Sequence, residues 1–321
     1  MNVLITGAAG YLGHQLVTHL LEQSAHTVIA ADIREESPFP LHERLQYVKL
    51  DVRAPEATAI FQQHAVEVVV HLASIVTPGK HSDRSFEYSV DVLGTENILQ
   101  ACVAANVRRI IVSSSGAAYG YYADNAAWLT EEHAIRGNEV FAYSHHKRLV
   151  EEMLAVYRQQ HPQLEQTIFR IGTILGENVR NQITNLFEQK VLLGIAGSDS
   201  PFVFIWDQDV VACFVKAIDS DVTGIFNVAG DGALTIDELG ILLNKRVIKI
   251  PATAVYSGLF ALKRLHLTQY GEEQIDFLRY RPVLLNTKLK EQFGYIPMKT
   301  SLEAFELYMW SRMKEAATVL S

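Results

Sequence analysis

Short apolar runs alternate along the chain with stretches that carry apolar residues at helical spacing. The run at 66–73 is nearly continuous, which is typical of a parallel strand buried on both faces. Further strands are predicted at 3–6, 26–32, 45–50, 109–112 and 166–176, and helices at 12–20, 83–105 and 141–160. Strands that alternate with helices in this way predict an α/β fold built on a parallel sheet.

The first predicted strand runs directly into a turn that contains Gly7, Gly10 and Gly13. Leu16 and Leu20 follow at helical spacing, so the predicted order is strand, tight turn and helix. A pyrophosphate can approach the backbone N–H groups at the start of such a helix, where a Cβ atom would block it. The opening therefore predicts a dinucleotide site on a Rossmann-type, doubly wound parallel sheet, although an ordinary Gly-rich turn has the same composition.

The second predicted strand ends in Asp32, about twenty residues beyond the glycine turn. A carboxylate at that place would accept hydrogen bonds from both ribose hydroxyls of NAD and would repel the 2′-phosphate of NADP. Asp32 therefore predicts NAD as the cofactor. The alternative is a solvated loop acid, and Arg34 is the one nearby residue that could weaken the discrimination.

Tyr143 and Lys147 are four residues apart in a predicted helix, so they share one helix face. The Lys147 ammonium would then lie close enough to stabilise a Tyr143 phenolate. Tyr295 and Lys299 have the same spacing, but Pro297 lies between them and prevents the helix that would bring them together. The sequence therefore favours the first pair as the proton-transfer pair.

These motifs together resemble the extended branch of the short-chain dehydrogenase/reductase superfamily and its NAD-dependent epimerase/dehydratase family. The Gly-x-x-Gly-x-x-Gly turn is similar to that branch, and Ser115, four residues before Tyr119, stands at the family's catalytic Ser/Thr position. The resemblance implies that the chain is an NAD-dependent enzyme. It also implies that Ser115 holds a substrate hydroxyl or ketone, that Tyr143 moves its proton and that Lys147 assists.

The resemblance also implies which residues hold NAD. Asp51 and Val52 resemble the family's adenine site, and the end of the strand at 66–73 resembles the segment that passes the cofactor ribose. The full set implied for the cofactor is Gly7, Ala9, Gly10, Tyr11, Leu12, Gly13, Asp32, Asp51, Val52, Leu72, Ala73, Ser74, Ser113, Tyr143, Lys147 and Ile171. His71 is expected to be structural, and Asp91 stands where the family's helix usually carries Asn.

The second half of the chain resembles the family more loosely. Thr173 stands where sugar-nucleotide enzymes usually carry Asn, and Trp206 replaces a His in a segment without a nearby Arg. The substrate residues implied are Ser115, Thr173, Trp206 and Arg281, of which Arg281 would meet a phosphate.

The chain is expected to divide into two domains. A Rossmann NAD-binding domain is expected at 1–172, with 203–232 returning to it, and a smaller C-terminal α/β substrate-binding domain at 173–202 and 233–321.

Three functions stay open from the sequence. The leading one is an epimerase or dehydratase that acts on a hydroxyl or keto carbon, with a nucleotide sugar as the small-molecule substrate implied by the resemblance. A dehydrogenase or reductase of a smaller, non-nucleotide alcohol or ketone would use the same catalytic set. A non-catalytic NAD-sensing regulator is the third, and the intact Ser115, Tyr143 and Lys147 argue against it.

The resemblance further implies a homodimer. Extended members commonly pair two helices from each subunit, which here correspond to 83–105 and 141–160. Both stretches carry apolar residues at helical spacing that could meet a second copy, namely Leu93, Ile98, Leu149, Met153 and Val156.

Composition and motif spacing argue against nucleic acid, a membrane and a metal ion as partners. The 321 residues carry a formal net charge of −8 with dispersed Lys and Arg, so no basic face is expected for nucleic acid or a membrane surface. No apolar run approaches the ~20 residues that cross a bilayer, and the first strand begins at Asn2, so we expect no signal peptide and a cytoplasmic location.

Cys102 and Cys213 lack CxxC spacing and are expected in the core. His145 and His146 diverge around their helix without a third ligand, so no metal is expected and both are predicted at the helix surface or the crevice rim.

Overall fold

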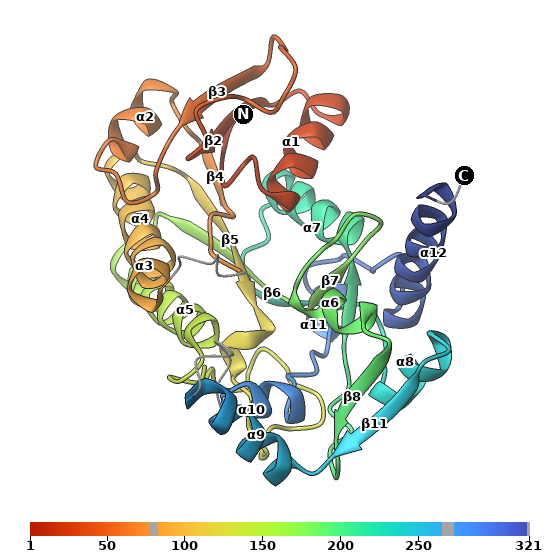
Figure 1. The fold of residues 1–321 in the computed structure, drawn as a ribbon. Coiled ribbons are helices and arrows are strands. Elements are labelled where there is room, and N and C mark those ends of the chain that lie inside the picture. Colours follow the sequence, from red (N-terminus) through yellow and green to blue (C-terminus); the bar gives the residue numbers. More distant parts are fainter. Residues whose placement is uncertain (77–82, 265–272, 320–321) are drawn as a thin grey trace.

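The computed structural model describes residues 1–76, 83–264 and 273–319. In these residues the central sheet has seven parallel strands in the order β10-β6-β5-β4-β1-β2-β3 (Figure 1). The strands are β1 (Asn2–Thr6), β2 (Thr27–Asp32), β3 (Leu45–Lys49), β4 (Val68–His71), β5 (Arg109–Ser115), β6 (Glu165–Ile171) and β10 (Gly224–Val228). The strand order reverses between β1 and β4, and ligands of open α/β sheets bind at such a reversal, outside the carboxyl ends of the strands.

Helices cover both faces of the sheet, which confirms the predicted α/β class (Figure 1). One face is covered by α1 (Tyr11–Gln23) and α7 (Asp207–Asp219), and the other by α2 (Ala57–Gln63), α4 (Gly94–Ala104) and α5 (Ala142–Gln160). In β1, Val3 and Ile5 belong to the first core and Leu4 to the second. Apolar side chains on both faces explain why the strand sequences are continuous apolar runs. The two thiols, at Cys102 and Cys213, are free and buried in these cores, as predicted.

The other elements lie beside the carboxyl edge of the sheet (Figure 1). Two small parallel sheets pair β7 (Thr173–Leu175) with β9 (Phe204–Trp206), and β8 (Val191–Ile195) with β11 (Arg246–Ile250). Around them lie α6 (Gln182–Glu188), α8 (Ile236–Leu242), α9 (Ala252–Arg264), α10 (Glu273–Arg279), α11 (Thr287–Glu291) and α12 (Ser301–Val319). Between β9 and α8 the chain returns to the central sheet, because α7 packs against α1 and β10 pairs with β6. Across the described ranges, no helix has both the length and the apolar character that a membrane crossing requires.

The helix predicted at 83–105 is interrupted. It consists of α3 (Arg84–Tyr88), a π-helical turn η1 (Ser89–Leu93) and α4. The wider turn contains Asp91, whose carboxylate accepts hydrogen bonds from the loop after β4. A π-turn adds a residue to the helix and is frequent at functional sites. The amphipathic pattern of 83–105 predicted one continuous helix and did not reveal this turn.

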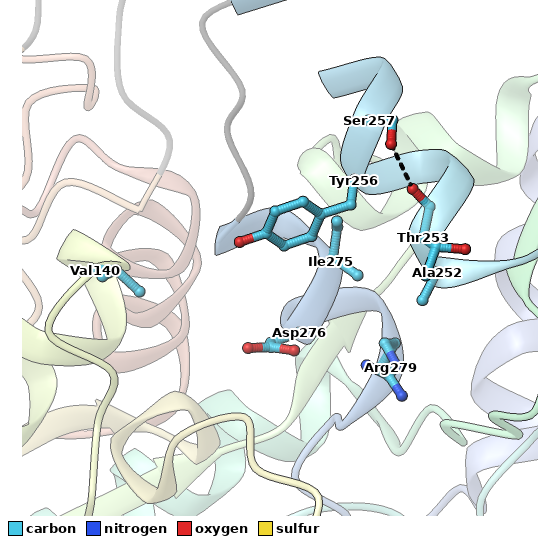
Figure 2. Close-up of a pocket in the computed structure, with 8 residues that line it drawn as sticks. All are labelled: Val140, Ala252, Thr253, Tyr256, Ser257, Ile275, Asp276 and Arg279. Atoms are coloured by element: carbon cyan, nitrogen blue, oxygen red, sulfur yellow. Dashed lines mark hydrogen bonds between the residues drawn. The ribbon is translucent and has the colours of Figure 1, made fainter. Parts of the chain in front are cut away.

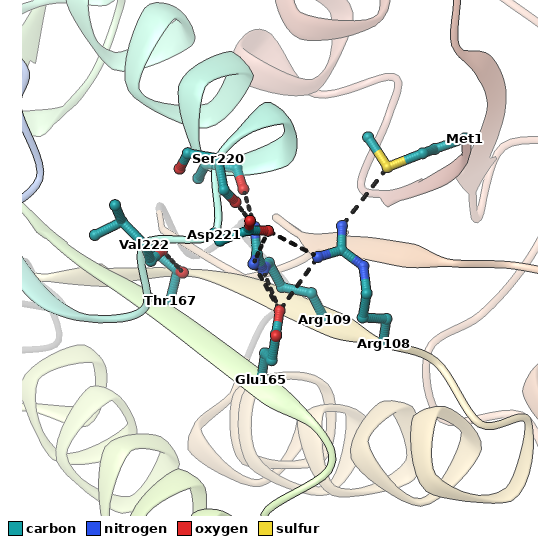
Figure 3. A network of polar contacts seen from close by, with 9 residues as sticks. Met1, Arg108, Arg109, Glu165, Thr167, Ser220, Asp221 and Val222 are labelled. Atoms are coloured by element: carbon teal, nitrogen blue, oxygen red, sulfur yellow. Dashed lines mark hydrogen bonds and ion pairs between the residues drawn. The ribbon is translucent and has the colours of Figure 1, made fainter.

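A buried arginine ties the amino ends of β5 and β6 to α7 (Figure 3). The Arg109 side chain is fully buried and donates from Nε and Nη2 to Glu165 Oε2, at 2.8 and 2.6 Å. Its Nη1 donates to the carbonyl oxygens of Ala217 and Ser220 at the end of α7. Asp221 lies 3.6 Å away but is almost fully exposed. Glu165 is therefore the carboxylate that compensates the buried guanidinium.

We expect Glu165→Gln to lower the free energy of unfolding by about 1–3 kcal/mol, because it leaves a buried charge without its carboxylate. The value is below that of a fully buried pair because the Glu165 side chain is 37% exposed. Urea denaturation measures the change. The matched control is Asp221→Asn, an equal charge change at 98% exposure, which should cost less than about 0.5 kcal/mol. Equal losses in the two variants would contradict the assignment.

Candidate active site

The turn between β1 and α1 lies directly against the end of β4. Gly7 has a φ of +66°, and a Cβ there would lie 2.9 Å from the backbone N of Ala73. A Cβ on Gly13 would lie 2.2 Å from the Gly7 carbonyl oxygen, so side chains are excluded at both positions. Gly10 precedes α1 without a side-chain cap, and the first N–H groups of the helix therefore keep their capacity to donate. This uncapped, glycine-lined helix start fits the pyrophosphate of a dinucleotide.

A cavity of about 1010 Å³ begins at this turn and extends along the carboxyl edge of the sheet. It brings together most of the residues predicted from the sequence for cofactor, catalysis and substrate. Those that line it are Gly7, Gly10, Tyr11, Leu12, Gly13, Leu72, Ser74, Ser113, Ser115, Tyr143, Lys147, Ile171, Thr173 and Arg281. The other predicted residues, Ala9, Asp32, Asp51, Val52, Ala73 and Trp206, do not line it.

Asp32 nevertheless lies at the glycine turn. Its Oδ2 accepts a hydrogen bond of 2.9 Å from the Ala9 N–H, and its Oδ1 accepts one of 3.2 Å from the Arg34 N–H. Asp32 is 8% exposed and terminates β2, which lies next to β1 in the sheet. The carboxylate is thus held in place by backbone donors, beside the start of the cavity.

Asp51, Val52 and Trp206 contact other parts of the chain. Asp51 is paired with Arg53, whose hydrogen bond is the main cause that holds the pKa of this carboxyl below its usual range. The Val52 carbonyl oxygen accepts from Asn97 Nδ2 at 2.7 Å. The Trp206 ring packs against the ammonium of Lys299, 4.9 Å away, in a separate core, so the structure does not bring Trp206 to the cavity.

The three predicted catalytic side chains come from the end of β5 and the start of α5. Ser115 is the last residue of β5, and its Oγ accepts from the Ala117 N–H at 3.1 Å, which caps the 3₁₀ helix η2 (Gly116–Tyr119). Lys147 is 6% exposed and donates from Nζ to the Ser113 carbonyl oxygen at 3.0 Å. Its Nζ is 5.5 Å from the centre of the Tyr143 ring. Ser115, Tyr143 and Lys147 therefore share one part of the cavity wall.

The second Tyr–Lys pair has a different role. The Tyr295 hydroxyl donates to Asp209 Oδ1 at 2.6 Å, and Asp209 also accepts from the backbone N–H groups of Met298 and Lys299. Tyr295 lies in a non-helical segment, as Pro297 predicts. The pair is part of a structural network at the start of α7.

A buried ion pair joins α5 to β6, close to the predicted catalytic residues. Glu151 on α5 accepts from Arg170 on β6, with Arg170 Nη2 2.7 Å from Oε2, and it also accepts from Ser114 Oγ at 2.6 Å. Arg170 Nη1 donates to the Tyr119 hydroxyl at 2.8 Å, and that hydroxyl is 2.8 Å from Asn227 Oδ1 on β10. The sequence did not predict this network, because its members are far apart along the chain.

The far end of the cavity is aromatic with one embedded cation. Arg281 donates from Nη1 to the backbone oxygen and the hydroxyl of Ser200, at 3.0 and 3.1 Å. Its guanidinium carbon lies 3.8 Å from the centre of the Phe202 ring and 5.5 Å from that of Phe277. Burial lowers the pKa of Arg281 to about 9, and among the described residues no carboxylate pairs with it. A half-buried guanidinium without a carboxylate partner favours an anionic or strongly polar ligand group.

Several lining residues escaped the sequence analysis. Tyr121 is buried against Phe141 and Phe277, with ring centres 5.6 and 5.2 Å away, and burial raises the pKa of its phenol. Asn178 and Asn181, in the segment after β7, also line the cavity. No motif marks these positions, because tertiary packing alone brings them to the cavity.

The structure gives different answers for His71 and His146, both of which are buried. His71 is structural, as predicted: it lies between Thr6 Oγ1 at 2.7 Å and Thr95 Oγ1 at 3.0 Å, and burial lowers its pKa to about 3. The prediction for His146 was wrong. Its ring is 1% exposed and its Nδ1 is 3.2 Å from Asp91 Oδ2, because the inner face of α5 packs against η1.

A smaller cavity of about 550 Å³ lies between α9 and α10 (Figure 2). Tyr256, Ser257 and Thr253 line it from α9, and Asp276 and Arg279 from α10. None of the residues predicted for the cofactor, catalysis or substrate lies there. The candidate active site is therefore the larger cavity.

The fold and the larger cavity define an α/β enzyme that uses a nucleotide cofactor. The model of the NAD dependent epimerase/dehydratase family matches residues 3–229 of the chain. The chain belongs to this NAD dependent epimerase/dehydratase family, and its cofactor is NAD.

The chain is also similar to individual proteins. It is 26% identical over 318 residues to an uncharacterised protein of Mycobacterium tuberculosis. This alignment covers 97% of this chain and 84% of that protein. It is 29% identical over 216 residues to a UDP-glucose 4-epimerase of Yersinia enterocolitica, covering 60% and 62% of the two chains.

Solved structures share the fold. A UDP-glucose 4-epimerase of Thermotoga maritima with UDP-glucose has a TM-score of 0.75 at 20% identity and covers 98% of this chain and 100% of that one. A Thermus thermophilus UDP-glucose 4-epimerase in complex with NAD has a TM-score of 0.73 at 21% identity, with 97% and 98% covered. At these identities the likeness concerns the fold.

Proposed function

We propose that this chain moves a proton and a hydride at a hydroxyl or keto carbon of a nucleotide sugar, as an epimerase or a dehydratase. The observation that carries the proposal is a single cavity lined by the start of α1, by Ser115 and by the Tyr143–Lys147 pair. An NAD-sensing regulator would not need a serine and a tyrosine–lysine pair in the wall of the cofactor cavity.

The residues present fit NAD along one path. The N–H groups at the start of α1, after Gly10, would hold the pyrophosphate, and Asp32 would accept from the adenosine ribose. Ser74, Ser113 and Ile171 line the same cavity as Ser115, Tyr143 and Lys147 and would meet the nicotinamide half. The chemistry that NAD supplies when bound is acceptance and return of a hydride.

The protein side of the reaction rests on three groups. Ser115 Oγ would hold the substrate oxygen, and the Tyr143 hydroxyl would take its proton and give it back. Lys147 is fixed by its hydrogen bond to the Ser113 carbonyl, so its ammonium stays beside the Tyr143 ring and would favour the phenolate electrostatically. The same set serves an epimerase, a dehydratase and a dehydrogenase.

The substrate end supports a ligand with an anionic group. Arg281 and Thr173 line this part of the cavity, and Arg281 lacks a carboxylate partner in the described ranges. A phosphate of a nucleotide sugar would supply that charge. The aromatic wall of Phe202, Phe277 and Tyr121 favours the second candidate, a smaller non-nucleotide alcohol or ketone with an apolar body.

We also propose the division of the chain and its assembly. A cofactor domain at 1–172 and 203–232, with a substrate domain at 173–202 and 233–321, is supported by the return of β10 to the sheet. The homodimer stays a prediction, supported by Leu93 and Val156, which are 46% and 49% exposed on the helices concerned. Ile98 cannot contribute to such an interface, because it is fully buried in the core beneath α4.

We expect the protein to bind NAD at least tenfold more tightly than NADP, a difference of about 1.4 kcal/mol. Asp32→Asn keeps an oxygen for the Ala9 N–H but removes the charge, so the preference should fall to about threefold or less. Calorimetric titration with both cofactors measures this. Glu35→Gln, which removes an exposed carboxylate just beyond β2, should leave the ratio unchanged. Equal affinities in the wild type would refute the role of Asp32.

Tyr143→Phe keeps the ring and removes the acid–base hydroxyl, so turnover should fall by roughly 10²–10⁴ while NAD binding persists. Chromatography of UDP-, dTDP- and GDP-sugars after incubation measures turnover. Tyr295→Phe is the matched control. It should leave turnover per folded molecule unchanged and cost about 1 kcal/mol of stability through the hydrogen bond lost to Asp209. Similar turnover in both variants would show that Tyr143 is not the acid–base group.

The nucleotide part of the proposal is tested by thermal shift with UDP, dTDP and GDP. At least one of them should raise the Tm of the wild type, and Arg281→Ala should abolish the shift because the phosphate loses its buried partner. Arg279→Ala, which changes an arginine of the smaller cavity, should keep it. If none of the three nucleotides stabilises the wild type, the smaller alcohol or ketone becomes the better candidate.

A further inference from the structure

Asp91 is a buried carboxylate close to the proposed catalytic pair. It is 3% exposed and lies in the π-turn η1, where its Oδ1 accepts from the Ile75 N–H and from Ser74 Oγ, both at 2.9 Å. Ser74 lines the candidate active site. Asp91 thus fixes the backbone that follows β4 at the cavity wall.

The second oxygen of Asp91 faces α5. Oδ2 is 3.2 Å from His146 Nδ1, and His146 lies between Tyr143 and Lys147 in the sequence of α5. Burial alone would raise the pKa of Asp91, but the hydrogen bond from His146, the positive charge of Lys147 and the Ile75 N–H together hold it below its usual range. Asp91 is therefore ionised near neutral pH and lies within electrostatic reach of Lys147.

The other titratable groups around η1 do not cancel this charge. On β4, His71 is neutral, because burial lowers its pKa to about 3. On α3, Glu87 is buried, Tyr88 meets the His146 ring edge-on with centroids 5.7 Å apart, and Arg84 donates to the Glu139 carbonyl oxygen.

Two further charged groups near η1 and α4 face other partners. Arg53 reaches Ser89 of η1 but pairs with Asp51. Glu96 on α4 acts electrostatically on Tyr157. On α5, Glu151 stands four residues after Lys147 but is paired with Arg170. The charge of Lys147 acts directly on Asp91.

A neutral Asn, which the sequence led us to expect at this place, would act differently. Its amide oxygen could still accept from the Ile75 N–H, but it would carry no charge to offset Lys147. The carboxylate accepts only, and in this chain donors meet both of its oxygens. The exchange of Asn for Asp is thus accommodated by His146, and its lasting consequence is one negative charge beside the Lys147 ammonium.

We propose that Asp91 is a positioning residue of the active site that fixes the loop after β4 and offsets the charge of Lys147, so that the Tyr143 phenolate forms at a higher pH than a neutral residue would allow. The proposal rests on the proposed function only in giving Tyr143 and Lys147 their catalytic roles. Its electrostatic part concerns the protein alone and requires no substrate.

Ultraviolet titration of tyrosinate tests this part. The full-length protein is titrated with and without saturating NAD, and the difference between wild type and Tyr143→Phe isolates the ionisation of Tyr143. The same difference is then measured in an Asp91→Asn background. We expect its midpoint to move to lower pH by about 0.5–1 unit, because removal of a nearby negative charge makes the phenol easier to ionise.

Three further variants complete the test. Asp91→Ser, a neutral residue of another size, should give the same downward shift, and it replaces Asp91→Asn if that variant fails to fold. Glu96→Gln removes one charge from the neighbouring helix and should leave the midpoint unchanged. Asp91→Glu keeps the charge and should restore a midpoint near that of the wild type.

The possible results of the titration distinguish the proposal on Asp91 from the proposed function. A downward shift in the neutral Asp91 variants without one in Glu96→Gln supports the proposal. A midpoint within about 0.2 unit of wild type in a folded neutral variant, or an equal shift in Glu96→Gln, overturns it. If the shift is present but Tyr143→Phe retains full turnover of its substrate, the electrostatic coupling holds and the proposed function fails instead.

Discussion

Glu151 and Arg170 form an ion pair in the interior of the protein. This pair fixes the strand and the helix that carry the candidate active-site residues. The pair joins α5 to β6, and Glu151 also accepts from Ser114, one residue before Ser115. Removal of one partner from such a pair costs about 3–5 kcal/mol, because a buried charge is left uncompensated. The relative position of β5 and α5 thus depends on this contact.

A second tie holds the cofactor turn to the opposite side of the cavity. The Tyr11 hydroxyl donates to Asp207 Oδ2 at 2.5 Å, and Asp207 begins α7 directly after β9. The glycine turn is therefore anchored to the segment that connects the small sheet with the central one. The helices α1 and α5 pack on opposite faces of the sheet, and the first residues of both line the same cavity.

The parts of the site that the sequence predicted depend on short-range patterns. Glycines at fixed spacing before a helix, and Tyr143 four residues before Lys147, are readable because one turn of backbone sets their geometry. The Asp91–His146 and Glu151–Arg170 pairs were not predicted, since each joins separate elements and neither spacing carries a signal. Trp206 shows that a motif position alone can mislead. The resemblance implied a substrate residue there, but the ring packs against Lys299 and a separate core instead of lining the cavity.

A crystal structure of the protein with NAD tests most directly whether the glycine turn and the start of α5 bind one cofactor molecule. We expect the pyrophosphate against the N–H groups at the start of α1, the adenosine ribose at Asp32, and the nicotinamide beside Tyr143 and Lys147. A dinucleotide bound elsewhere, or with its nicotinamide directed away from Tyr143, would contradict it.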